Sequence, residues 1–214
     1  MNELLYIAET YLSRKPAKSS TTVGLAMTTL LCAASFVYWE NILGIGSSLP
    51  GNPRAVFQNH EYWRLLTGVL VHADLDHFFS NAPGFALLTG LIYGYYGWTA
   101  CLALTFAAGS AVNLMSLLTY PPDTILTGAS GVVYLLAAFW LTMYVFLERR
   151  HSAAGRLLRG VGFSLVMLFP TALVPQVSYR THAIGFAVGV MLAFLYFLRK
   201  KEYFRRFEIY QLDS

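Results

Sequence analysis

The feature of this sequence that most restricts its fold is the recurrence of long apolar stretches. A helix needs about 20 apolar residues to cross a hydrocarbon core of about 30 Å. Several stretches come close to this length, at approximately 22–38, 77–96, 98–118, 128–147, 161–174 and 182–198. The fifth is the weakest, because Pro170 and Pro175 interrupt it. With 56% hydrophobic and 12% charged residues, the chain is predicted to be an all-α membrane protein with six transmembrane helices.

The basic residues indicate how these helices are oriented. All 15 Lys and Arg lie outside the predicted spans, and only Arg54, Arg64 and Arg180 fall on the side opposite the two tails. Positive charge is retained on the cytoplasmic face during insertion, so we expect both termini to be cytoplasmic. The spans starting near 77, 128 and 182 then run from the outside inward. The expected organisation is a cytoplasmic tail over 1–21, a six-span domain over 22–198 and a basic cytoplasmic tail over 199–214.

The same charge distribution bears on partners. Because the basic residues follow the predicted topology, they do not indicate a nucleic-acid partner, which favours basic and aromatic residues together on a soluble face. The tail sequence RKKEYFRRF, beside the last span, suits contact with anionic lipid headgroups, although a solvated tail is the alternative. Cys32 and Cys101 both fall inside predicted spans. Neither a disulfide framework nor a thiolate metal site is therefore expected.

Strongly polar side chains inside a membrane are costly, and each is a candidate functional residue. The second span begins HADLDHFFSNAPG, in which His77 and Asn81 are four residues apart and share a helix face. Ser130 begins the fourth span within Gly-Ala-Ser-Gly, and His182 begins the sixth. Since these three spans run in the same direction, all four residues are expected at one depth, near the outer side of the membrane.

Each of these residues also has an ordinary structural interpretation. A serine at a helix start is often an N-cap or a small packing residue. A lone intramembrane histidine often bonds a backbone carbonyl, and Asn81 could join two helices. His72, Asp74 and Asp76, at the mouth of the second span, are either headgroup-level residues or part of an entry path for water. The coincidence of depth is what favours a functional interpretation.

Together these groups suit acyl transfer. The Ser130 hydroxyl is a weak nucleophile alone, and the His182 imidazole is able to accept its proton. No Asp or Glu lies at this depth in a predicted span, so we expect a dyad, with the Tyr134 ring packing against the imidazole. The Ser130 N–H, the Asn81 amide and the His77 ring are candidate donors to a developing oxyanion.

In this order and spacing, the motifs resemble those of the rhomboid intramembrane serine proteases, specifically the compact bacterial six-span kind. The resemblance covers about 23–198. The residues that carry it are Trp63-Arg64, His72, His77-x-x-x-Asn81, Gly128-x-Ser130-Gly131 with Tyr134, and His182-x-x-Gly185-x-x-x-Gly189. The last pair also forms a Gly-x-x-x-Gly motif, which lets a neighbouring helix approach closely.

The resemblance implies cleavage of single-span membrane proteins in or near their transmembrane segment, with membrane lipids around the enzyme and without metal or cofactor. It implies Ser130 as nucleophile, His182 as general base, His77 and Asn81 as oxyanion donors, and Gly128 within the same site. It also implies a structural role for Trp63-Arg64 and a location in a bacterial inner membrane, with the active site near its outer side. One departure is the lack of an acidic residue in the inner half of the second span, near Tyr93.

Two alternatives remain open. One is a non-catalytic rhomboid-like module that binds transmembrane helices without cutting them. The other is a small transporter, which is less favoured because transporter sites usually lie near the bilayer midplane between broken helices.

Overall fold

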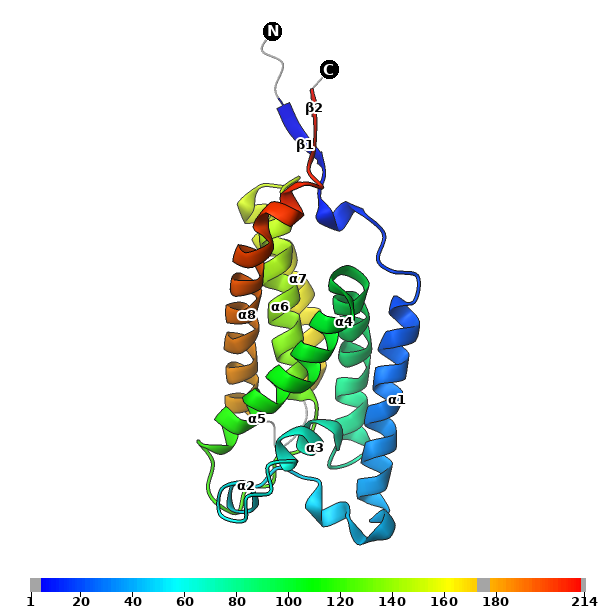
Figure 1. The fold of residues 1–214 in the computed structure, drawn as a ribbon, viewed down its shortest axis with the longest axis vertical. Helices are drawn as coiled ribbons and strands as arrows, with labels where there is room; N and C mark the ends of the chain where they lie inside the picture. The colour runs from blue at the N-terminus through cyan, green and yellow to red at the C-terminus, as the bar shows by residue number, and fades with distance from the viewer. Residues whose placement is uncertain (1–4, 173–177, 213–214) are drawn as a thin grey trace.

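The computed structural model describes residues 5–172 and 178–212. It is a bundle of long helices, with both chain termini projecting together from one end (Figure 1). The helices of the bundle are α1 (Ser20–Trp39), α4 (Leu75–Leu102), α5 (Gly109–Leu117), α6 (Ser130–Leu147), α7 (Ala153–Ala172) and α8 (Tyr179–Arg205). A six-residue π-helical segment, Ala103–Ala108, joins α4 to α5. The predicted all-α membrane fold is confirmed.

Four helical segments of the described chain are long and apolar enough to cross a membrane: Ser20–Trp39, Leu75–Leu117, Ser130–Leu147 and Tyr179–Arg205. The second contains the predicted span 77–96 and all but the last residue of the predicted span 98–118. Gly97 separates them, because its φ of 80° and ψ of −179° break the helix. Figure 1 shows the chain turning back in this region, with α5 running in the return direction. The fifth predicted span falls largely within α7, and its last residues, 173–174, lie outside the described part. The total of six spans therefore stays a prediction.

The helix α6 is the centre of the bundle. Within the most apolar window of each segment, 56% of α6 is buried, compared with 28% of α1. Glycines let the backbones approach on either side of the bundle. A Cβ at Gly189 of α8 would meet the Leu135 carbonyl of α6, and one at Gly24 of α1 would meet the Ala86 carbonyl of α4. Membrane helices commonly associate through such small residues, because lipid provides no hydrophobic drive for larger ones to pack.

The segment between α1 and α4 forms a compact lobe at the end of the bundle away from the termini. It contains two 3-10 turns, Ile42–Gly44 and Gly46–Ser48, followed by α2 (Pro53–Phe57) and α3 (Arg64–Leu70). The Asn113 side chain of α5 donates to the Leu65 carbonyl of α3 over 3.0 Å. The polar Asn113 therefore ties the lobe to the bundle.

The two tails pair with each other, which the sequence did not predict. Strands β1 (Leu5–Glu9) and β2 (Ile209–Leu212) form an antiparallel pair in which Leu5 faces Leu212. Next to them, Tyr11 of the 3-10 turn Tyr11–Ser13 is buried among aromatic rings that include Phe204 and Phe207. The two ends of the chain are therefore fastened together at one end of the bundle.

Candidate active site

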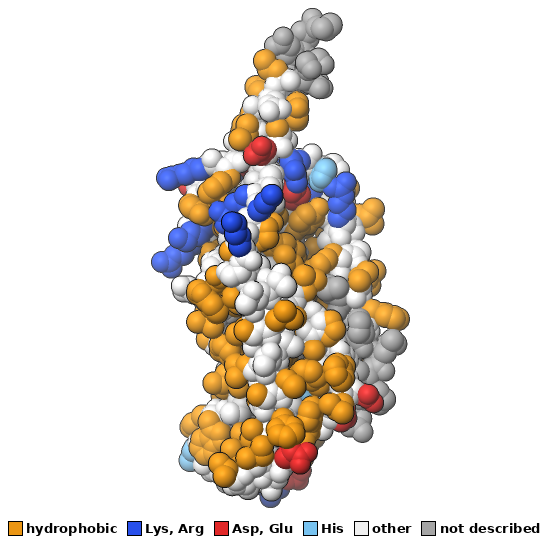
Figure 2. All heavy atoms as spheres, turned by 90° about the vertical axis from the view of Figure 1, so that its right-hand side faces the viewer, with side chains coloured by type: hydrophobic (Ala, Val, Ile, Leu, Met, Phe, Trp, Pro, Cys, Tyr) orange, Lys and Arg blue, Asp and Glu red, His pale blue; other side chains and the backbone are white. Residues whose placement is uncertain are grey.

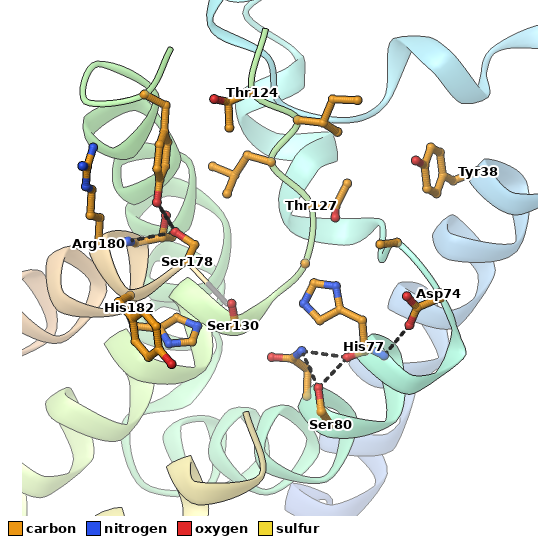
Figure 3. Close-up of a pocket in the computed structure, with 18 of the residues that line it drawn as sticks. Tyr38, Asp74, His77, Ser80, Thr124, Thr127, Ser130, Ser178, Arg180 and His182 are labelled. Carbon is orange, nitrogen blue, oxygen red and sulfur yellow. Dashed lines mark hydrogen bonds between the residues drawn. The ribbon is translucent and has the colours of Figure 1, made fainter. Parts of the chain in front are cut away.

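A cavity of about 640 Å³ opens at the end of the bundle opposite the termini. Its walls come from the first turns of α4, α6 and α8 and from the segment Tyr120–Gly128. The four polar residues singled out by their depth, His77, Asn81, Ser130 and His182, all line it. Figure 3 shows Ser130 and His182 on one side of this cavity and His77 facing them from α4. Three segments far apart in sequence thus deliver polar groups to one place.

Ser130 owes its position to the glycine two residues before it. Gly128 has a φ of 104°, which L side chains rarely adopt, and this turn leads the chain directly into α6 at Ser130. A Cβ at Gly128 would also lie 2.5 Å from Cε1 of the His77 ring. The N–H groups of the first turn of a helix have no intrahelical acceptor. The Ser130 hydroxyl therefore lies beside backbone donors, with the His77 ring against Gly128.

His182 lies in the first turn of α8. The Ser178 side chain caps this helix by accepting from the Thr181 N–H over 3.2 Å. The His182 side chain is buried, and its imidazole stacks on the Tyr134 ring with centroids 4.0 Å apart and planes 15° apart. Tyr134 is one turn beyond Ser130 on α6. The aromatic stack therefore orients the imidazole relative to the helix that carries the serine.

The two helices touch at the residues next to Ser130 and His182. A Cβ at Gly131 would lie 2.8 Å from Cγ2 of Thr181, and a Cβ at Gly185 would lie 2.3 Å from the Gly131 carbonyl oxygen. The backbones of α6 and α8 are thus in direct contact within one turn of both side chains. Within the described residues, no hydrogen bond joins the Ser130 hydroxyl to the His182 ring (Figure 3).

On the α4 side of the cavity, Asn81 and His77 form a local network. The Asn81 amide donates to the His77 carbonyl over 2.8 Å and to Ser80 Oγ over 3.2 Å. Asn81 Oδ1 is buried and has no hydrogen-bond partner among the described residues. Asp74 caps α4 by accepting from the His77 N–H over 2.7 Å. The Asp74 carboxylate therefore shapes the mouth of the cavity and is bound to backbone.

His72 has a larger role than its position in the sequence indicates. It is fully buried, and its Nε2 accepts from the Ala129 N–H over 3.2 Å, next to Ser130. Because Nε2 accepts, the ring proton of the neutral form is on Nδ1, which lies 3.1 Å from the Ser35 hydroxyl of α1. Burial, with a smaller contribution from His77, lowers the pKa of His72 to about 3. A neutral His72 therefore braces the loop before Ser130 against α1.

A second polar cluster holds the start of α8. The Tyr120 hydroxyl lies within hydrogen-bond distance of both Ser178 Oγ and Thr181 Oγ1, and Arg180 donates to the Thr119 carbonyl over 2.8 Å. These contacts fix the first turn of α8, which carries His182, to the loop after α5. The sequence offers little signal for them, because Tyr120 and Ser178 are 58 positions apart.

Trp63 and Arg64 lie in the lobe between α1 and α4. Arg64 is buried and donates to the carbonyls of Ser47 and Pro50 over 2.8 and 3.1 Å, and it pairs with Glu61. Trp63 is 54% exposed, and its indole N–H donates to the Ser48 carbonyl over 3.2 Å. Arg64 therefore holds the turns of the lobe together from inside, and Trp63 covers them from outside.

Comparison with known proteins places the chain in one family. The Rhomboid domain family model matches residues 59–199. The chain is 28% identical over 148 residues to "Putative rhomboid protease YdcA" of Bacillus subtilis, covering 67% of this chain and 71% of that protein. It is 26% identical to RHOMBOID-like protein 1 and to RHOMBOID-like protein 5 of Arabidopsis thaliana, over 67% and 75% of this chain. It spans 37% and 54% of the length of these two plant relatives.

Proposed function

The chain belongs to the rhomboid family, and we propose that it is an intramembrane serine endopeptidase that cleaves single-span membrane proteins in or near their transmembrane segment. The observation that carries the proposal is the contact of α6 and α8 through Gly131 and Gly185, within one turn of Ser130 and His182. That contact supports a working pair of hydroxyl and imidazole, because it holds their backbones together with no intervening side chain.

In the proposed reaction, Ser130 Oγ attacks the carbonyl carbon of the scissile peptide bond. His182 takes the serine proton and then gives it to the leaving amine, so the bond breaks and an acyl-enzyme forms. A water molecule, deprotonated by His182, attacks this ester and releases Ser130. Catalytic hydrogen bonds are often long in the absence of substrate and tighten only when substrate binds.

In a conventional triad a carboxylate orients the histidine, and here we propose that the Tyr134 ring does so instead. Among the described residues, Asp74 is the only carboxylate lining the cavity, and it accepts from the His77 backbone. The Tyr134 ring, stacked on His182 at 4.0 Å, would take over the orienting role. Stacking fixes the plane of the imidazole and leaves both ring nitrogens at its edge.

Negative charge on the tetrahedral intermediate requires donors, each commonly worth about 3 kcal/mol of transition-state stabilisation. The Ser130 N–H, the His77 ring and the Asn81 amide are the proposed donors. His77 is supported by its packing on Gly128. Asn81 would contribute by redirecting to the oxyanion the amide proton that it otherwise gives to Ser80 Oγ.

The proposed setting is a bacterial inner membrane, with both termini cytoplasmic and the cavity near the outer side. The arginines and lysines support this orientation, because they gather at the end of the bundle from which the strands project (Figure 2). Membrane lipids and a transmembrane substrate are the proposed partners.

The test is cleavage of a reporter transmembrane substrate by the purified protein in proteoliposomes. Ser130→Ala and His182→Ala should each abolish cleavage while the thermal unfolding midpoint stays near that of the wild type. Ser110→Ala, a serine of α5 outside the cavity, is the matched control and should cleave normally. Retained cleavage by the Ser130→Ala protein would rule the proposal out. Substrate binding without cleavage by the wild type would instead favour a non-catalytic module.

A further inference from the structure

A second cavity, of about 320 Å³, lies at the opposite end of α6 and α8 from the candidate active site. Its walls come from the last turn of α6, the first turns of α7 and the last turns of α8. Leu147 is 17 positions after Ser130 on α6, so the two cavities are roughly 25 Å apart along this helix. We propose that this second cavity binds an anionic phospholipid, with the phosphate on Arg156 and Arg205. The proposal does not depend on the chain being a protease.

The charge of the cavity favours an anion. Arg149, Arg156, Arg205 and Glu208 line it. Arg149 Nη1 donates to both oxygens of Glu208 over 2.9 Å, and Glu208 also accepts from the Tyr210 hydroxyl over 2.8 Å. Within the described part of the chain, neither Arg156 nor Arg205 has a carboxylate oxygen within 4.0 Å. The cavity therefore presents two uncompensated guanidinium groups.

One of these groups has a buried donor without an acceptor. Arg156 Nη1 donates to the Val145 carbonyl, which holds the guanidinium against the end of α6. Arg156 Nε is buried and has no hydrogen-bond partner among the described residues. Leaving a buried donor of a charged group unpaired is costly. A phosphate oxygen would satisfy it with a charge-assisted hydrogen bond, which guanidinium groups form well.

The remaining lining explains why a lipid fits better than free phosphate. Val145, Phe146, Leu147, Phe197 and Phe204 form an apolar wall. Phe146 and Phe197 stack with centroids 4.6 Å apart, and Phe146 also contacts Phe194, which is 46% exposed on α8. Apolar side chains thus lead from the arginines to the outer surface of the bundle. An acyl chain could follow this path, whereas inorganic phosphate would gain nothing from it.

Tyr11 closes the cavity without adding charge. Its hydroxyl donates to the Tyr95 carbonyl, and burial raises its pKa to about 12, so the phenol stays neutral. Figure 2 shows lysines and arginines gathered at this end of the bundle, between the apolar belt and the projecting strands. This is the level at which lipid phosphates lie, and basic pockets between membrane helices are known to hold anionic headgroups.

The experiment compares two double variants of the full-length protein that remove the same charge. Arg156→Gln with Arg205→Gln removes the arginines that line the cavity. Arg159→Gln with Arg206→Gln removes neighbouring arginines that do not line it, one on α7 and one just after the end of α8. Each protein is placed in phosphatidylcholine nanodiscs and titrated with phosphatidylglycerol. Two quantities are recorded: the midpoint of thermal unfolding, and the lipids that stay bound in native mass spectrometry.

We expect the cavity variant to bind phosphatidylglycerol about thirtyfold more weakly, since each basic residue near a membrane surface contributes about a fivefold effect. The control variant should remain within threefold of the wild type. Inorganic phosphate should stabilise neither. Equal losses in both variants would mean general surface attraction, and full stabilisation by inorganic phosphate would mean a free-anion site; either result overturns the proposal. If the double variant does not fold, the single variant Arg205→Gln, which changes an exposed residue, should bind phosphatidylglycerol about fivefold more weakly. An unchanged affinity in this variant would also overturn the proposal.

Discussion

Replacing Gly185 by alanine should disable the proposed dyad without changing either of its members. The new Cβ would lie 2.3 Å from the Gly131 carbonyl oxygen, whereas ordinary contacts of this kind begin at 3.4 Å. The obstacle is backbone, so a side-chain rotation cannot relieve it, and α8 must move away from α6 by about 1 Å. His182 moves with α8, and a misplacement of this size costs about 100-fold in catalysis. Overpacking at such a contact also costs about 1–3 kcal/mol of stability.

The assay is cleavage of the reporter substrate in proteoliposomes, read as kcat/KM beside the thermal unfolding midpoint. Gly162→Ala is the matched control, because a Cβ at this exposed position of α7 meets nothing within 4 Å. The control should keep full activity and unchanged or slightly raised stability. A Gly185→Ala protein that is folded and cleaves within twofold of the wild type would show that the helix contact does not position the dyad.

Three further predictions concern the groups around the site. The pKa of His72 is lowered from 6.5 to about 3, so below pH 6.5 the unfolded chain takes up a proton that the folded chain does not. Between pH 7 and pH 5 the free energy of unfolding of the wild type should therefore fall by about 2 kcal/mol more than that of the His72→Gln protein. Equal losses in the two proteins would contradict this. Tyr120→Phe removes the hydroxyl beside Ser178. It should lower the free energy of unfolding by about 1 kcal/mol and should lower kcat more than it changes KM in the reporter assay. An unchanged kcat would show that Tyr120 does not position α8. Arg64→Ala leaves Glu61 and two carbonyls without their buried donor. The free energy of unfolding, measured with a chemical denaturant, should fall by about 3–5 kcal/mol and should recover in part in the Arg64→Lys protein. A fall below about 1 kcal/mol would contradict the structural role of Arg64.

Much of the site could be predicted because two simple constraints act on this sequence. Charge alternation assigns a direction to each span, and the polar residues lie near the span starts. Ser130 and His182 could therefore be placed at one depth before the contact between α6 and α8 was known. The spacing of Gly185 and Gly189 predicted close helix approach, and both glycines lie against carbonyls of α6. Periodicity and spacing were sufficient here because the membrane restricts the fold to packed helices.

Other parts depend on packing between distant segments, which a single sequence does not reveal. His72 looked like a mouth residue, and its bond to the Ala129 N–H, 57 positions away, exists only because α1, α4 and α6 meet there. The strand pair of the tails likewise depends on α8 ending beside the start of the chain.

The most direct test of the account is mass-spectrometric mapping of a fluorophosphonate probe on the full-length protein in membranes. We expect the probe to modify Ser130 in the wild type and not to modify the Ser130→Ala protein. His182→Ala should slow modification at least 100-fold while the protein remains folded. Modification of a different residue, or an equal labelling rate in the His182→Ala protein, would contradict the claim that the imidazole of α8 activates the hydroxyl of α6.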